Sequence, residues 1–152
     1  MTTLGKILAD KEHQIWSIKP DATVFDALKL MGDKNIGAVL VMDGEALVGI
    51  LSERDYARKV ILLGKSSRDT LVSEIMTPRV ICMRADQTAE ECMALMTEKY
   101  IRHLPVLNAD NRIIGVVSIG DVGRAIIAQQ QFTIAHLEHY IASSEAMFYR
   151  SS

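Results

Sequence analysis

The sequence has few cysteines, few aromatic residues and no large excess of charge of one sign. Its 152 residues include two cysteines, and 5% are Phe, Trp or Tyr. Small secreted chains that depend on disulfides are much richer in cysteine, so no disulfide framework is expected. The net charge of −2 argues against a general nucleic-acid binder, and the scarcity of aromatic residues argues against a base-stacking surface.

The sequence also lacks a long hydrophobic run. No apolar stretch reaches the roughly 20 residues that a membrane-spanning helix needs. The N-terminal residues 1–14 are polar and charged rather than signal-like. A hydrophobic fraction of 49% and a charged fraction of 24% are typical of a folded globular domain. These features predict a cytoplasmic protein with no membrane partner.

Motifs of several enzyme classes are missing as well. The sequence contains no G-x-x-x-x-G-K-[ST] phosphate loop, no G-x-S-x-G and no H-E-x-x-H. Cys82 and Cys92 do not form a C-x-x-C motif. His136 and His139 lie three residues apart, but no third His or Cys is near them, so we expect no metal site. The chain is not expected to be an enzyme.

What the sequence does contain is an internal repeat. The segment that begins at Pro20 aligns with the segment that begins at Ala85 at an offset of 65 residues. The offset becomes 66 after residues 108–111, so that Asp55 matches Asp121. Insertions are tolerated best in turns, which indicates that residues 108–111 form one.

Both copies predict the element order strand–helix–strand–strand–helix. The first helix of each copy is predicted behind the candidate N-caps Thr23 and Thr88, with apolar residues at i, i+3, i+4 and i+7. Two apolar runs follow, and Asp43-Gly44 between the first pair is a strong hairpin signal. A copy of about 45 residues is too small to bury a good core alone. We therefore expect an α+β fold in which two copies pack together.

The repeat divides the chain into four predicted segments. The first unit covers residues 1–64, a linker covers 65–80, and the second unit covers 81–128. Residues 129–152 lie beyond the repeat, and their apolar residues recur as on one face of a helix. We expect these last residues to form a C-terminal helical extension.

The most specific pattern closes each predicted hairpin. It reads Gly, two hydrophobic residues, Ser, two further residues and Asp. Its Ser and Asp are Ser52 and Asp55 in the first copy and Ser118 and Asp121 in the second. One interpretation is helix capping, because Ser is a good N-cap and Asp favours the first turn. The other is a ribonucleotide site, because a helix N-terminus favours phosphate and a carboxylate accepts hydrogen bonds from ribose hydroxyls.

The duplicated stretches, the linker Glu74-Ile-Met-Thr-Pro78 and the segment Arg102-His-Leu-Pro-Val106 together resemble the CBS domain, named for cystathionine β-synthase. The resemblance covers roughly residues 4–128 and is that of a stand-alone tandem CBS pair, or Bateman module. It implies two units packed as a pseudo-twofold pair and a homodimer of such pairs. It also implies a regulatory role, with AMP, ATP, NAD or another adenosyl compound as ligand and an unidentified protein as effector.

The resemblance further implies two ligand clefts, one at each Asp. Arg54 precedes Asp55, whereas Gly120 precedes Asp121, so cations suited to phosphate are unevenly distributed and we expect the clefts to differ in affinity or ligand. The resemblance implies binding residues at the first Asp, which are Ser52, Asp55 and Thr77, and at the second, which are Ser118, Asp121 and Lys11. It also implies cations for the phosphate, which are Arg54, Arg102 and His103. The residues expected beside the base are Trp16, Ile36, Gly37, Ala38 and Ile81.

Simpler interpretations stay open for several of these residues. Arg54 can be a solvated helix charge, His103 a core histidine, and Trp16 a packed core residue. Two further functions stay open for the whole chain. One is a structural dimerisation module with vestigial clefts, and the other is a weak nucleic-acid binder.

Overall fold

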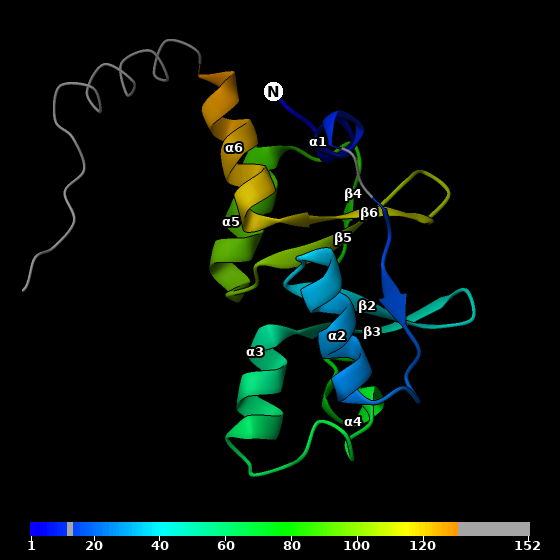
Figure 1. Ribbon diagram of the computed structural model, residues 1–152. Coiled ribbons are helices and arrows are strands. Elements are labelled where there is room, and N and C mark those ends of the chain that lie inside the picture. Colours follow the sequence, from blue (N-terminus) through cyan, green and yellow to red (C-terminus); the bar gives the residue numbers. More distant parts are fainter. Residues whose placement is uncertain (12–13, 131–152) are drawn as a thin grey trace, which may run out of the picture. The chain divides into compact units, whose positions relative to one another are not determined.

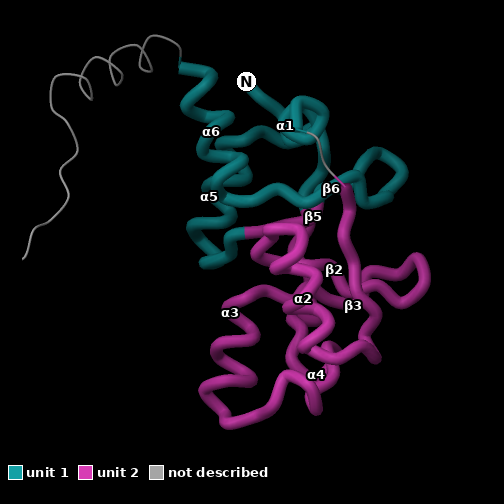
Figure 2. Tube along the Cα trace, viewed as in Figure 1, with its two compact units in different colours: residues 1–12, 83–102, 106–152 teal, residues 13–82, 103–105 magenta. Residues whose placement is uncertain are grey.

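The structure is a computed structural model that describes residues 1–11 and 14–130 (Figure 1). These described residues form an α+β fold with two three-stranded sheets, which confirms the predicted fold class. The chain forms two compact units (Figure 2). The described part of unit 1 consists of residues 1–11, 83–102 and 106–130, and that of unit 2 of residues 14–82 and 103–105.

Unit 2 holds the first copy of the repeat. Its sheet has the order β1-β2-β3, in which β1 runs parallel to β2 and β3 runs antiparallel to β2. The elements in chain order are β1 (Ser17–Ile18), α2 (Val24–Lys34), β2 (Ala38–Asp43), β3 (Ala46–Ser52), α3 (Glu53–Tyr56), the π-helix η1 (Ala57–Ile61) and α4 (Val72–Ile75). This is the predicted order of the copy, followed by a short helix from the linker.

Unit 1 holds most of the second copy. Its sheet has the order β4-β5-β6, with β4 parallel to β5. The first three residues of β5, 103–105, belong to unit 2. The elements are α1 (Leu4–Asp10), β4 (Met83–Arg84), α5 (Ala89–Lys99), β5 (His103–Leu107), β6 (Ile113–Ser118) and α6 (Ile119–Gln129).

The ends of the helices and turns follow from particular residues. The hydroxyls of Thr23 and Thr88 accept hydrogen bonds from the third backbone N–H of α2 and α5, both at 3.2 Å, as predicted for N-caps. Asn35 and Tyr100, with φ of 54° and 56°, adopt the left-handed conformation that commonly ends a helix. Gly44, with φ of 63°, forms the turn between β2 and β3 where the sequence predicted a hairpin.

The core of unit 2 is the apolar face of α2 packed on the sheet. Val24, Ala27 and Met31 are buried on α2, which confirms the predicted helix face, and Leu28 beside them is half-buried. The other buried members come from β2, β3, η1 and α4: Val39, Val41, Leu51, Val60, Val72 and Ile75. Removing this apolar area from water is the main stabilising contribution to such a unit.

Short helices from distant parts of the chain complete both copies in the same way. In unit 2, Leu71 forms a backbone bridge with Thr23 at the start of α2, and α4 follows. In unit 1, Thr3 forms the equivalent bridge with Thr88, and α1 follows. The N-terminal residues therefore pack with the second copy, as the linker helix packs with the first.

The compact units differ from the boundaries drawn on the sequence. Residues 1–11 lie in unit 1 with most of the second copy, whereas the repeat predicts them in segment 1–64 with the first copy. A repeat alignment shows which residues match, but it does not show which copy a flanking helix packs against. The boundaries at 64, 80 and 128 stay a prediction, and the extension 129–152 lies outside the described residues from 131 onward. Within the described residues, no helix combines the length and apolarity that crossing a membrane requires.

Candidate functional site

Each Ser–Asp pair forms a capping box at the junction of a strand and a helix. Ser52 Oγ accepts the Asp55 N–H at 3.2 Å, and the Asp55 carboxylate accepts the Ser52 N–H at 2.9 Å. The corresponding distances for Ser118 and Asp121 are 3.1 and 2.9 Å. The capping interpretation is thus confirmed in both copies. The boxes also hold both carboxylates in fixed orientations, which a binding site requires.

The Asp55 carboxylate is surrounded by groups from three parts of unit 2. Thr77 Oγ1 donates to Asp55 Oδ1 at 3.3 Å, and Lys59 Nζ lies 3.0 Å from the same oxygen. Lys59 also donates to the Ile75 carbonyl at 2.9 Å, which links the end of α4 to η1, the π-helix that follows α3 and Asp55. The Asp55 side chain is 13% exposed. Thr77 therefore lies beside Asp55, where the family resemblance puts it.

A glycine lets the linker reach Asp55. Ile50 and Thr77 exchange backbone hydrogen bonds of 3.0 and 2.9 Å, which brings the linker alongside β3. A Cβ on the preceding residue, Gly49, would lie 2.5 Å from Met76 Sδ and 3.1 Å from the Thr77 carbonyl oxygen. The absence of a side chain at Gly49 thus permits the close approach that positions Thr77.

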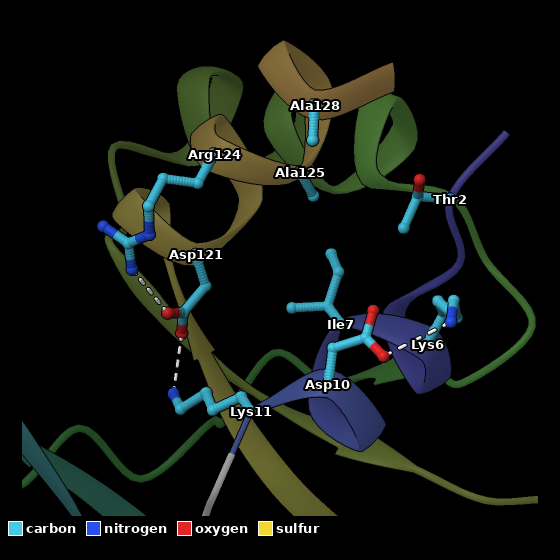
Figure 3. Close-up of a pocket in the computed structure, with 9 residues that line it drawn as sticks. All are labelled: Thr2, Lys6, Ile7, Asp10, Lys11, Asp121, Arg124, Ala125 and Ala128. Atoms are coloured by element: carbon cyan, nitrogen blue, oxygen red, sulfur yellow. Dashed lines mark hydrogen bonds and ion pairs between the residues drawn. The ribbon is translucent and has the colours of Figure 1, made fainter. Parts of the chain in front are cut away.

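The Asp121 carboxylate in unit 1 is held by two cations (Figure 3). Lys11 Nζ donates to Oδ2 at 2.8 Å, and Arg124 Nη2 donates to Oδ1 at 2.9 Å. The Asp121 side chain is 9% exposed. Burial opposes its ionisation, but the hydrogen bonds from Lys11 and the Ser118 N–H and the Lys11 charge together hold the pKa of this carboxyl below its usual value. Asp121 is therefore ionised at neutral pH.

A cavity of about 370 Å³ lies beside Asp121 in unit 1 (Figure 3). Helices α1 and α6 supply most of its wall. Its lining combines cationic, acidic and small apolar side chains: Thr2, Lys6, Ile7, Asp10, Lys11, Asp121, Arg124, Ala125 and Ala128. The predicted site residues Lys11 and Asp121 are both in this lining.

A second cavity, of about 540 Å³, lies in unit 2 between α2 and α3. The predicted residues Ile36 and Gly37 line it, together with Glu53 and Tyr56. Gly37 accepts the Glu53 N–H at 3.1 Å, and a Cβ on Gly37 would lie 3.2 Å from His103 Cε1. His103 and Gly37 are thus neighbours in unit 2.

The remaining predicted residues lie in varied surroundings. Trp16 packs against the core of unit 2, and Lys34 Nζ lies 4.4 Å from its ring centroid, which fits a packed residue with a cation over its face. Ala38 is buried at the start of β2. Arg102 is exposed, and its carbonyl accepts the Ile119 N–H at 2.8 Å. Arg54 and Ile81 are half-buried.

Sequence reasoning missed two cations, Lys59 and Arg124. Each lies one helical turn after an Asp, at i+4 from Asp55 or i+3 from Asp121, a spacing that brings side chains together on a helix. That spacing was the available signal. Among residues 1–11 and 14–130, no three His, Cys, Asp or Glu side chains are grouped to hold a metal ion, and His136 and His139 lie outside these residues.

Comparison with known proteins agrees with this arrangement. The sequence model of the CBS domain matches residues 11–61 and 72–128. The Arabidopsis thaliana protein CBSX3, named mitochondrial, is 39% identical over 150 residues, which cover 92% of this chain and 72% of that protein.

Two solved structures extend the comparison. A CBS-domain protein from Burkholderia ambifaria is 50% identical, has a TM-score of 0.81, and is matched over 88% of this chain and 99% of its own. The protein CBSX2 in complex with AMP is 28% identical, with a TM-score of 0.67, over 86% of this chain and 99% of its own. The duplicated sequence, the fold and these matches show that the chain belongs to the CBS domain family, as a tandem pair of CBS domains.

Proposed function

We propose that this protein is a regulatory CBS pair that binds an adenine nucleotide. The observation that carries the proposal is the duplicated arrangement in which a capping box fixes an Asp carboxylate beside one or two cations. The similarity to CBSX2, whose structure contains AMP, supports an adenosyl ligand.

The chemistry of each site suits a ribonucleotide. Asp55 and Asp121 each carry oxygens that accept hydrogen bonds, and an acidic residue holds ribose hydroxyls in other nucleotide folds. Lys59 lies beside Asp55, and Lys11 and Arg124 lie beside Asp121. These cations supply the positive charge that a phosphate group needs.

The proposed role is sensing rather than catalysis. The sequence has no G-x-x-x-x-G-K-[ST], G-x-S-x-G or H-E-x-x-H motif, and the relative from Burkholderia ambifaria has signal transduction in its name. A sensor requires that the ligand bind one conformation better than another. We propose that the nucleotide acts in this way on a homodimer of CBS pairs in the cytoplasm, and that a separate effector protein reads the change.

A structural dimerisation module is the second candidate. The observation in its favour is that each Ser and Asp of the two capping boxes has a hydrogen-bond partner within the box itself. In that case the repeated pattern would serve helix initiation alone.

Isothermal titration calorimetry separates these two functions. Protein stripped of carried-over nucleotide is titrated with AMP, ATP, NAD and S-adenosylmethionine, after circular dichroism has shown that it is folded. We expect saturable heat with at least one adenine nucleotide. Flat traces with all four ligands would overturn the proposal and favour the dimerisation module. Binding to a generic oligonucleotide that weakens steeply with salt, with no nucleotide binding, would instead indicate a nucleic-acid binder.

A further inference from the structure

The two copies differ at the residue that precedes the Asp. The first copy has Arg54 there, and the second has Gly120. On sequence alone, the second copy thus lacks a cation at this place. The structure shows that a different side chain, Arg124, comes to this place in the second copy.

Arg124 folds back over Gly120 in unit 1. A Cβ built on Gly120 would lie 3.2 Å from Arg124 Nη1 and 3.7 Å from Nη2. Arg124 Nη2 is then 2.9 Å from Asp121 Oδ1. Any side chain at position 120 would compete for the space that the guanidinium occupies. The glycine and the arginine therefore form a matched pair of residues.

In the first copy, the cation that contacts the Asp is not the matching arginine. Arg58, which aligns with Arg124, is exposed, and Lys59 contacts Asp55 instead. Alanine stands at the position that matches Lys59, Ala125. Each copy thus brings a cation to its Asp from a different position on the helix.

The charges beside Asp121 leave an excess of positive charge. Lys11 and Arg124 both contact this single carboxylate, and Lys6, which is paired with Asp10, lines the same cavity. Three cationic and two acidic residues are therefore among those that line the cavity of about 370 Å³ (Figure 3). Arg124 is 74% exposed, and a guanidinium has five N–H donors, so one bond to Asp121 leaves donors for an anion.

We propose that this cavity receives the phosphate end of the nucleotide in the second site, and that Arg124 is the residue that selects for phosphate there. The inference rests on the proposed function, since Asp121 is the expected ribose partner. The ligand class is a nucleoside 5′-phosphate rather than a nucleoside. Asp121 Oδ1 accepts one bond from Arg124 and, with two lone pairs, can accept a ribose hydroxyl as well.

The test compares AMP with adenosine by calorimetry. Titrations are made in an Asp55→Asn background. Asparagine can still accept the Ser52 N–H, but it has one acceptor oxygen in place of two, so the first site should lose the ribose hydroxyls and the second site should give the heat. Arg124→Ala is expected to weaken AMP binding about tenfold or more, the range of a hydrogen bond to a charged group, and to leave adenosine binding unchanged. Arg58→Ala, at the matching position of the first copy, is the control and should change neither affinity.

A second variant tests the role of the glycine. Gly120→Ala keeps Arg124 but places a methyl group 3.2 Å from Nη1, so it should weaken AMP binding less than Arg124→Ala and again spare adenosine. Equal losses for AMP and adenosine in Arg124→Ala would show a structural role through Asp121 and overturn the inference. Unchanged AMP binding in Arg124→Ala would overturn it too. So would AMP binding that is present in the parent protein but absent in the Asp55→Asn background. If the parent protein binds no nucleotide at all, the proposed function fails instead.

Discussion

Replacing Gly49 by alanine tests how the linker is held beside Asp55. The added Cβ would lie 2.5 Å from Met76 Sδ, 2.9 Å from its Cγ and 3.1 Å from the Thr77 carbonyl oxygen. The Met76 side chain can move, but the Thr77 carbonyl belongs to a backbone bridge with Ile50 that has hydrogen bonds of 3.0 and 2.9 Å. Part of the overlap therefore falls on backbone that cannot move without losing these bonds.

We expect Gly49→Ala to lower the free energy of unfolding by about 1–3 kcal/mol, the usual cost of overpacking a well-packed site. For a chain of this size, 1 kcal/mol changes Tm by about 2–4 °C. The melting temperature followed by circular dichroism should therefore fall by about 2–12 °C.

Gly32→Ala is the matched control for this substitution. No atom lies within 4 Å of a Cβ at Gly32, which is an exposed position in α2. Alanine is a better helix residue than glycine by about 0.5–1 kcal/mol, so this variant should melt at a higher temperature than the parent. A Gly49→Ala protein that melts at or above the parent temperature would refute the close approach described above.

Three other predictions follow from the same contacts. Ser52→Ala removes the cap of α3 and should lower the free energy of unfolding by about 0.5–2 kcal/mol in a urea titration, whereas an unchanged midpoint would contradict the capping role. The lowered pKa of Asp121 stabilises the fold above the ordinary carboxyl pKa of about 3.9, and this contribution is lost as pH falls through the lower folded value. Asp121→Asn should therefore flatten the fall of Tm below pH 4 relative to the parent, and parallel curves would count against this linkage. Burial raises the pKa of Cys92 to about 11, so its thiol should react with iodoacetamide at pH 8 only after unfolding. The assay uses the Cys82→Ser variant, in which Cys92 is the remaining thiol, and rapid labelling of this folded variant would contradict the burial of Cys92.

The order of elements was predictable because local signals and the repeat agreed. Thr23 and Thr88 begin their helices as expected, and Asp43-Gly44 leads into the turn that joins β2 to β3. The Ser–Asp pattern was found as well, but its two interpretations could not be separated, because one pair of side chains can both cap a helix and face a ligand. The capping box is now seen in both copies, and ligand binding stays a prediction.

The packing of α1 could not be predicted from the repeat. The backbone bridge between Thr3 and Thr88 joins residues far apart in the sequence, and no local pattern specifies that pairing. The approach of Arg124 to Asp121 was also not predicted, because a comparison of the residues that precede each Asp shows only the loss of a cation at Gly120 and does not include the next turn of the helix. Spacing of three or four residues from each Asp would have identified Lys59 and Arg124 as candidates.

The measurement that tests the central claim most directly is an AMP titration of the parent, Asp55→Asn, Asp121→Asn and the double variant. Asparagine can keep the hydrogen bond from the Ser N–H while removing the carboxylate charge, so the fold should survive, and circular dichroism checks that it does. We predict that each single variant loses the binding of its own site and that the double variant gives no heat. AMP binding by a folded double variant with the affinity of the parent would contradict the claim that these two carboxylates hold the nucleotide.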